Sequence, residues 1–231
     1  MKAFIVFFLL TGLCIQTVQA QDETALIEKI KQKLDQVQNY VATGSMKTDV
    51  AFIKAPVGKV KIYFQQPNHF KLVRDGGISI LPKGGVSVNM NAIMANNNYV
   101  ALFAGNSITD GFSTKIVKLL PMNENSDIIL TTLYIDEKNL LIRKAITTTR
   151  DNGTYQINLQ YGQYSNWGLP DKVIFTFNTK DYKIPKGVTL EMDEPLTDAD
   201  RKKMQQKEGR VIIDYTSYSI NKGIPLGIFK H

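Results

Sequence analysis

The chain has 231 residues, with 28 Lys and Arg against 21 Asp and Glu, and contains a single cysteine, Cys14. Cys14 lies in a segment that we predict to be removed, so the mature chain is expected to have no thiol. That excludes disulfides, thiolate catalysis and cysteine-based metal sites, and leaves stability to a hydrophobic core for which the chain is long enough.

The N-terminus has the features of a secretory signal peptide. Lys2 is followed by an almost unbroken apolar run over residues 3–13, and Val18 and Ala20 occupy the positions that a signal peptidase reads. The run is shorter than the roughly 20 apolar residues that span a membrane. We therefore predict cleavage after Ala20 and export of residues 21–231. Lipoprotein processing needs a small residue just before the cysteine, where this chain has Leu13. We therefore predict that Cys14 is not lipidated.

The basic residues are scattered along the sequence rather than clustered. Because an exported protein also rarely meets nucleic acid, we predict no nucleic-acid partner. A diffuse positive field favours anionic membrane surfaces or acidic partners, although ordinary solubility charge explains it at least as well.

One amphipathic helix is predicted from Thr24 to about Tyr40, capped at its start by Thr24 or Asp22. Its apolar residues recur at spacings of three and four, and charged residues fill the other face. Such a one-sided helix must lie on an apolar surface. The apolar positions are Leu26, Ile27, Ile30, Leu34, Val37 and Val41.

After the helix the apolar period changes to two, which is typical of strands with one buried face. Short turn signals separate the runs, so we expect an antiparallel meander. A sheet this long rarely stays flat, and it predicts an α+β domain in which a curled barrel or half-barrel is plugged by the helix. Alternation is clearest around residues 60–64, 154–161 and 172–177, and further strands are predicted at 41–53, 69–74, 98–104, 112–120, 127–135, 140–149 and 210–219.

Two stretches break the alternation without marking a domain boundary. Residues 82–98 are rich in Gly, Asn and Met and predict a loop with a small helix or lid. Residues 196–208 predict a second helix. A single mature domain over residues 21–231 follows.

Residues for catalysis are missing. Only His69 and His231 are present, and the chain has no paired histidines for zinc, no nucleophile elbow and no phosphate loop. The acidic run at 191–194 lacks the alternating ligands of a calcium loop. The sequence therefore predicts a protein that is not an enzyme and has no cofactor or metal.

Four motifs in order resemble the outer-membrane lipoprotein carrier family, the LolA-like proteins with their RseB-like relatives. The first motif, within residues 60–72, is a strand, then Gln66-Pro67-Asn68-His69-Phe70, then a second strand. The second is a strand over 111–121 that ends in Lys-Leu-Leu-Pro, and the third is a hairpin around Asp136 over 133–144. The fourth is a turn and strand over 152–161, followed by Leu-Pro-Asp-Lys-Val at 169–173.

The resemblance implies an unclosed β-barrel whose hydrophobic concavity is covered by helices. It also implies a periplasmic, monomeric carrier that takes acyl chains of lipoproteins, or other lipids, from an inner-membrane donor complex to an outer-membrane acceptor. We expect the cavity to be lined by Val60, Ile62, Phe64, Phe70, Leu72, Tyr155, Ile157, Leu159, Phe175 and Phe177. We expect a lid formed by Leu26, Ile30, Leu34 and Val37 of the helix and by Met90, Ile93 and Met94 of the loop.

The chain departs from the family pattern in three places. Proteobacterial carriers place an arginine, linked to lipoprotein release, where this chain has Gln66, and the nearest basic residues are Lys71 and Arg74. Residues 77–98 match poorly, and the segment beyond about 190 lies outside the match. The release mechanism therefore cannot be carried over as it stands.

The alternative function is a sensor or regulatory protein of the same fold that acts by protein–protein contact. An unfilled cavity would favour the carrier, whereas a filled core with an exposed apolar patch would favour the regulator.

Overall fold

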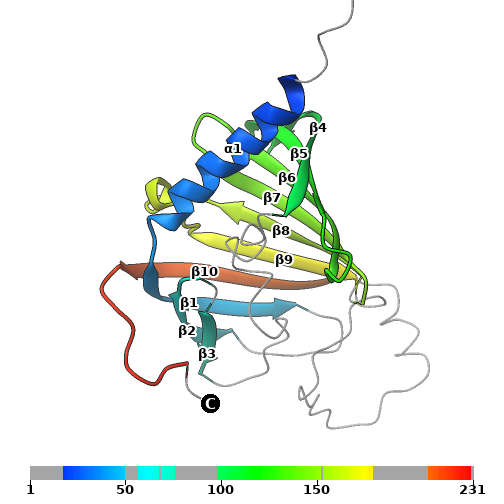
Figure 1. Cartoon of the computed structure of the whole chain (residues 1–231). Coiled ribbons are helices and arrows are strands. Elements are labelled where there is room, and N and C mark those ends of the chain that lie inside the picture. The colour runs from blue at the N-terminus through cyan, green and yellow to red at the C-terminus, as the bar shows by residue number, and fades with distance from the viewer. Residues whose placement is uncertain are drawn as a thin grey trace, which may run out of the picture.

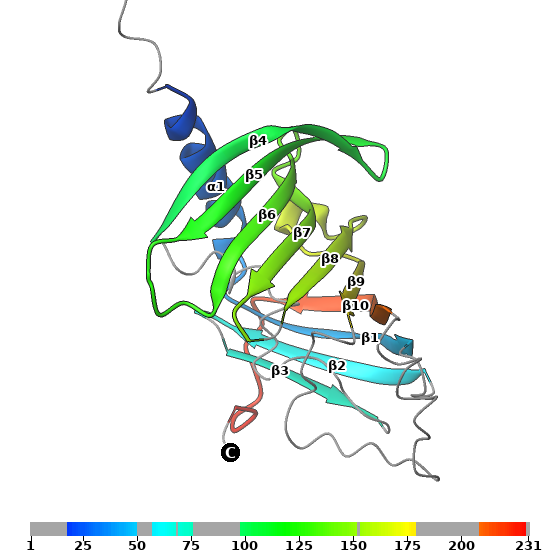
Figure 2. The ribbon, with the colours of Figure 1, turned by 90° about the vertical axis from the view of Figure 1, so that its right-hand side faces the viewer.

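The fold is one ten-stranded antiparallel sheet that curls without closing, with a helix across its concave side (Figures 1 and 2). The computed structural model describes residues 18–49, 57–67, 69–75, 98–151, 153–178 and 208–229. The predicted long, curled, unclosed sheet is thereby confirmed. Where several covering helices were expected, α1 is the one α-helix in the described ranges.

The strand order is β3-β2-β1-β10-β9-β8-β7-β6-β5-β4. Two runs of sequential neighbours, β1–β3 and β4–β9, are joined by β10, which pairs with both β1 and β9. The elements are α1 (Val18–Asp35), β1 (Asn39–Asp49), β2 (Gly58–Gln65), β3 (His69–Arg74), β4 (Tyr99–Thr109), β5 (Phe112–Pro121), β6 (Ile128–Asp136), β7 (Leu141–Thr149), β8 (Thr154–Gln160), the 3₁₀ turn η1 (Ser165–Trp167), β9 (Lys172–Asn178) and β10 (Glu208–Ile220).

Helix α1 buries the predicted apolar stripe but has different ends. It starts at Val18, so it includes Ala20, and it stops at Asp35 rather than near Tyr40. The chain turns at Gln36, and the Val37 N–H bonds to the Leu34 carbonyl at 3.0 Å. Val37 is therefore buried beside the helix and not in it, and Val41 belongs to β1. Beyond this turn the chain follows the period of strand β1, whose Tyr40 and Ala42 side chains are buried on the inner face of the sheet.

The inner face of the sheet carries one continuous core. Along β8 and β9 every second side chain is buried and the ones between are less buried, as period two requires. Strand β2 alternates from Gly58 to Ile62, after which Tyr63 and Phe64 are both buried. The largest fully buried side chains include Phe64, Phe175, Met46, Ile62 and Ile157. The core thus extends across the sheet and includes residues of α1.

Some predicted boundaries shift. Strand β4 continues to Thr109 instead of ending near 104, because a bulge between Phe103 and Asn106, with Gly105 at φ 109°, lets pairing with β5 resume. Glu208, predicted as the end of a helix, begins β10. The rest of that predicted helix, and the loop at 82–97, lie outside the described residues. Among the described residues, no helix combines the length and hydrophobicity needed to cross a membrane.

Candidate functional site: the concave face and its helix

The ten residues predicted to line a cavity all lie on the inner face. Directly opposed residues of an antiparallel pair share a face, and the ladders place Phe64 opposite Phe70 and Ile157 opposite Phe175. Phe70 and Leu72, on the edge strand β3, are half-buried and pack against the core. The others are buried, namely Val60, Ile62, Phe64, Tyr155, Ile157, Leu159, Phe175 and Phe177.

The predicted lid is described only in part. Leu26, Ile30 and Leu34 of α1 belong to the same buried cluster as the sheet residues. Met90, Ile93 and Met94 lie outside the described residues. The helix therefore covers the inner face, while the loop part of the lid stays a prediction.

An aromatic cluster that sequence reasoning missed lies on the inner face around β10. The Tyr218 ring contacts the rings of Tyr40 (5.3 Å between centroids), Tyr164 (4.8 Å) and Tyr215 (5.0 Å). The Tyr218 hydroxyl donates to the Pro170 carbonyl at 2.7 Å. Burial raises the pKa of the Tyr40, Tyr215 and Tyr218 phenols, so these hydroxyls stay neutral.

A bulge in the pairing of β1 with β10 explains why the sequence pattern does not predict this cluster. Tyr215 and Tyr218 are three residues apart, which in a regular strand puts side chains on opposite faces. The register between β1 and β10 shifts at Thr43 and Gly44, so Tyr215 opposes Gly44 while Tyr218 opposes Ala42. Both tyrosines therefore face inward. A Cβ on Gly44 would clash with the Asp214 carbonyl oxygen, which ties the bulge to glycine.

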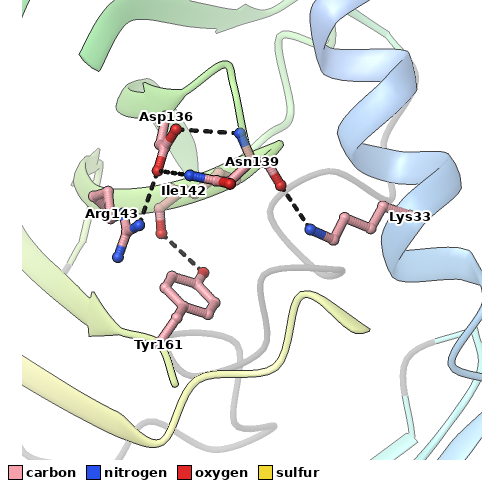
Figure 3. A network of polar contacts seen from close by, with 6 residues as sticks. All are labelled: Lys33, Asp136, Asn139, Ile142, Arg143 and Tyr161. Carbon is pink, nitrogen blue, oxygen red and sulfur yellow. Dashed lines mark hydrogen bonds and ion pairs between the residues drawn. The ribbon is translucent and has the colours of Figure 1, made fainter. Parts of the chain in front are cut away.

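A buried polar network lies at the β6–β7 turn beside α1 (Figure 3). Arg143 donates to the Asp136 carboxylate at 2.8 Å, and Asn139 donates to it from its side chain (2.8 Å) and its backbone N–H (3.2 Å). Burial acts to raise the pKa of Asp136, but the hydrogen bonds from Asn139 and Arg143 and the charge of Arg143 outweigh it and lower that pKa. The guanidinium also stacks on Phe112, 3.6 Å from the ring centroid.

This network reaches the helix. The Lys33 ammonium donates to the Asn139 carbonyl at 2.6 Å. Burial lowers the pKa of Lys33, and the Asp136 carboxylate opposes that shift. The Tyr161 hydroxyl donates to the Ile142 carbonyl at 2.9 Å, which completes the group seen in Figure 3.

The N-terminal part of α1 is held by an ion pair. Glu23 is buried, and its Oε1 lies 3.3 Å from Nζ of Lys115 on β5. The same ammonium lies 3.4 Å from Oε1 of the exposed Glu137. A charged contact therefore joins the helix to the sheet near the β4 edge.

The C-terminal end of α1 is held by Gln66. Its side-chain amide donates to the carbonyls of Asp35 (3.0 Å) and Val37 (3.2 Å). Two basic residues lie nearby. Lys71 faces outward and donates to the Ile228 carbonyl. Arg74 faces inward, and its side chain lies against Gly58. Polar contacts thus hold α1 at three points along its length.

Among the described residues no group of three or more His, Cys, Asp or Glu is arranged to hold a metal ion. His69 lies on the outer face, with its ring 5.5 Å from that of Phe229.

Solved structures show what this architecture is similar to. A protein from Vibrio parahaemolyticus, named as an outer membrane lipoprotein-sorting protein domain, aligns with a TM-score of 0.60 at 9% identity, over 91% of this chain and 97% of that one. A LolA superfamily protein from Nitrosomonas europaea aligns with a TM-score of 0.53 at 10% identity, over 93% and 99%. The chain has a LolA-like fold.

The LolA-like fold also occurs in a DUF1329 family protein from Desulfovibrio piger, which aligns with a TM-score of 0.57 at 12% identity, over 93% of this chain and 98% of that one. No family model and no curated protein sequence matches the chain. Likeness at such low identity shows the fold, and the function has to be argued from the site.

Proposed function

We propose that the protein is a periplasmic carrier that binds acyl chains of lipoproteins, or related lipids, on the concave face beneath α1 and brings them toward the outer membrane. The observation that carries the proposal is a continuous apolar inner face on an unclosed sheet, covered by one helix. The proposed role needs no catalysis and no cofactor. The Vibrio relative, named for lipoprotein sorting, supports it through the shared fold.

Acyl binding on the inner face requires α1 to give way, because Leu26, Ile30 and Leu34 of the helix are packed in the same buried cluster as the sheet residues. Burying the side chains of Leu26, Ile27, Ile30 and Leu34 contributes about 1.5–3 kcal/mol each, so roughly 6–12 kcal/mol in all. Burying an acyl chain of about 16 carbons contributes ~12 kcal/mol before association costs. Exchange of helix for ligand is therefore close to balanced, as a carrier that must release its cargo requires.

The first experiment is native mass spectrometry of the protein purified from the periplasm, followed by lipid extraction. We expect a mass above that of the mature chain and diacyl lipid or lipoprotein in the extract. A protein that carries no lipid, and that takes up none from added diacyl lipopeptide, would contradict the carrier function.

Adjacent residues of β3 give a matched pair of variants. Leu72 faces inward and is half-buried, whereas Val73 faces outward and is 40% exposed. Leu72→Ser is expected to weaken binding of a fluorescent 16-carbon fatty acid by about tenfold, because part of the apolar surface is lost. Val73→Ser should bind as the parent does. Equal losses in both variants would indicate a general effect on folding instead of a ligand site.

A regulatory protein acting by protein contact is the second candidate. It is favoured by apolar side chains exposed on the outside of β4 and β5, including Val100, Leu102 and Leu120, together with the burial of the inner-face side chains. Under this function the fatty acid would fail to bind in the experiment above.

A further inference from the structure

Apolar side chains gather on the outer face at one edge of the sheet. Val100 and Leu102 of β4 and Leu120 of β5 are 42%, 42% and 38% exposed, while their neighbours Ala101 and Leu119 are buried on the inner face. Val100 lies directly opposite Leu120. We call Val100, Leu102 and Leu120 the outer patch. Beyond the outer patch Met122 is 66% exposed, so apolar surface continues past the end of β5. The Met122 N–H bonds to the Asn98 carbonyl.

Basic residues flank the outer patch. Lys118 is exposed and lies directly opposite Leu102, and the Lys144 ammonium lies 4.8 Å from the centroid of the Tyr134 ring on the same face. The bias extends over the whole outer face of the described strands. Its basic positions are Lys47, Lys59, Lys61, Lys71, Lys118, Lys144, Lys172 and Arg210, and its acidic positions are Asp49, Glu208 and Asp214.

We propose that the outer face of β4–β7 is a docking surface for a membrane that contains anionic lipid. Apolar side chains of the outer patch enter the interfacial region, and Lys118 and Lys144 lie against the headgroups. Exposed aliphatic side chains beside lysines and a tyrosine fit this environment, because lysine stems and tyrosine rings are apolar along their length and polar at the tip. The positive face is attracted to the negative surface potential of such a membrane.

The position of the surface gives docking a consequence for the proposed carrier. Strand β4 is the last strand at one end of the sheet formed by the described residues, and the N-terminal part of α1 is fixed nearby through Glu23 and Lys115 (Figure 2). Docking through the outer patch would therefore bring the β4 edge of the sheet, beside the N-terminal part of α1, close to the lipid. This consequence rests on the proposed function, whereas membrane binding itself does not.

The test is co-sedimentation of the mature protein with vesicles of pure phosphatidylcholine or of equal parts phosphatidylcholine and phosphatidylglycerol. We expect binding to the anionic vesicles at about 0.1 M salt and its loss at about 1 M, where the Debye length falls from about 10 Å to about 3 Å. Leu102→Ser with Leu120→Ser should weaken binding about tenfold. Lys118→Glu should weaken it at least about fivefold.

Two control variants change exposed residues away from the surface. Leu226→Ser and Lys222→Glu alter exposed side chains of the C-terminal segment. Both should bind anionic vesicles as the parent does. Equal binding of patch and control variants, or absence of vesicle binding by the parent, would overturn the proposal. The proposal would also be overturned if the parent were a dimer that does not bind vesicles and Leu102→Ser were a monomer. The outer patch would then be a contact between two copies of the chain.

Fatty-acid binding separates this proposal from the carrier function. The outer-patch variants are expected to bind the soluble fluorescent fatty acid as the parent does, since Leu102 and Leu120 face away from the core. Vesicle docking without fatty-acid uptake would retain the docking surface and reject the carrier.

Discussion

Gln66 shows how much of the arrangement depends on single polar side chains. Its amide donates to two carbonyls, of Asp35 and Val37, at the end of α1. Gln66→Ala is expected to lower the free energy of unfolding by about 1–3 kcal/mol, because each of the two neutral hydrogen bonds contributes about 0.5–1.5 kcal/mol. Urea denaturation measures the change. The control is Gln65→Ala, which alters the exposed last residue of β2 next to Gln66, and equal losses in the two variants would contradict the assigned role.

The ion pair of Asp136 and Arg143 predicts a larger effect. Both side chains are buried, and Arg143→Ala would leave the carboxylate without its charged partner. We expect the free energy of unfolding at pH 7 to fall by about 3–5 kcal/mol. A loss below that of Gln66→Ala, measured in the same urea experiment, would show that the pair contributes little.

The same carboxylate predicts a pH dependence. Hydrogen bonds and the Arg143 charge lower the pKa of folded Asp136, so its contribution to stability is present above the ordinary aspartate pKa of about 4 and is lost as the pH falls through the lower folded value. Asp136→Asn should be less stable than the parent at pH 7 but should lose less stability between about pH 4 and pH 2. Parallel stability curves for the two proteins over that range would contradict this assignment.

At the scale of elements, α1 predicts a strong asymmetry between its faces. Ile30 is 1% exposed, whereas Gln32 is exposed to solvent. Ile30→Glu places a charge in the core and should unfold the protein or expose apolar surface, seen as a lower melting temperature and greater fluorescence of a hydrophobic dye. Gln32→Glu introduces the same charge on the other face and should change neither. An unchanged melting temperature in Ile30→Glu would mean that the helix face is not needed for the fold.

The sequence predicts the elements well wherever one periodicity holds. Alternation in β2, β8 and β9 correctly assigns Ile62, Ile157 and Phe175 to the inner face. Alternation fails at bulges, because one extra residue moves every later side chain to the opposite face of the sheet. Tyr218 faces inward only because the pairing register shifts at Gly44. Strand β4 continues beyond Phe103 only because of a second bulge. The predicted end of α1 is also wrong, because Val37 keeps the apolar spacing of a helix although the helix ends at Asp35.

The polar contacts were beyond sequence reasoning for a different reason. Glu23 and Lys115 are far apart in the chain, and so are Lys33 and Asn139. Nothing in the local pattern distinguishes these residues from ordinary charges on a solvated face. Only the crossing of α1 over the sheet brings them together.

For the whole molecule, a ligand that replaces α1 contacts predicts linkage between binding and stability. An acyl ligand at a concentration 100 times its Kd should raise the free energy of unfolding by about 2.7 kcal/mol, which appears as a higher melting temperature. The rise should be smaller in Leu72→Ser than in Val73→Ser at the same ligand concentration. A melting temperature independent of ligand in the parent would contradict binding to the folded state.

The position of β10 between β1 and β9 has a consequence for the order of folding. Strands β1–β3 and β4–β9 can each form from local hairpins, but the two groups meet only when β10 pairs residues near 40 with residues near 220. Closing so long a loop costs entropy before its contacts form, and proteins rich in such pairings fold slowly. Until then the edges of β1 and β9 are open to strands of other molecules. A newly made chain that stops before Glu208 is therefore expected to be the species most prone to aggregate.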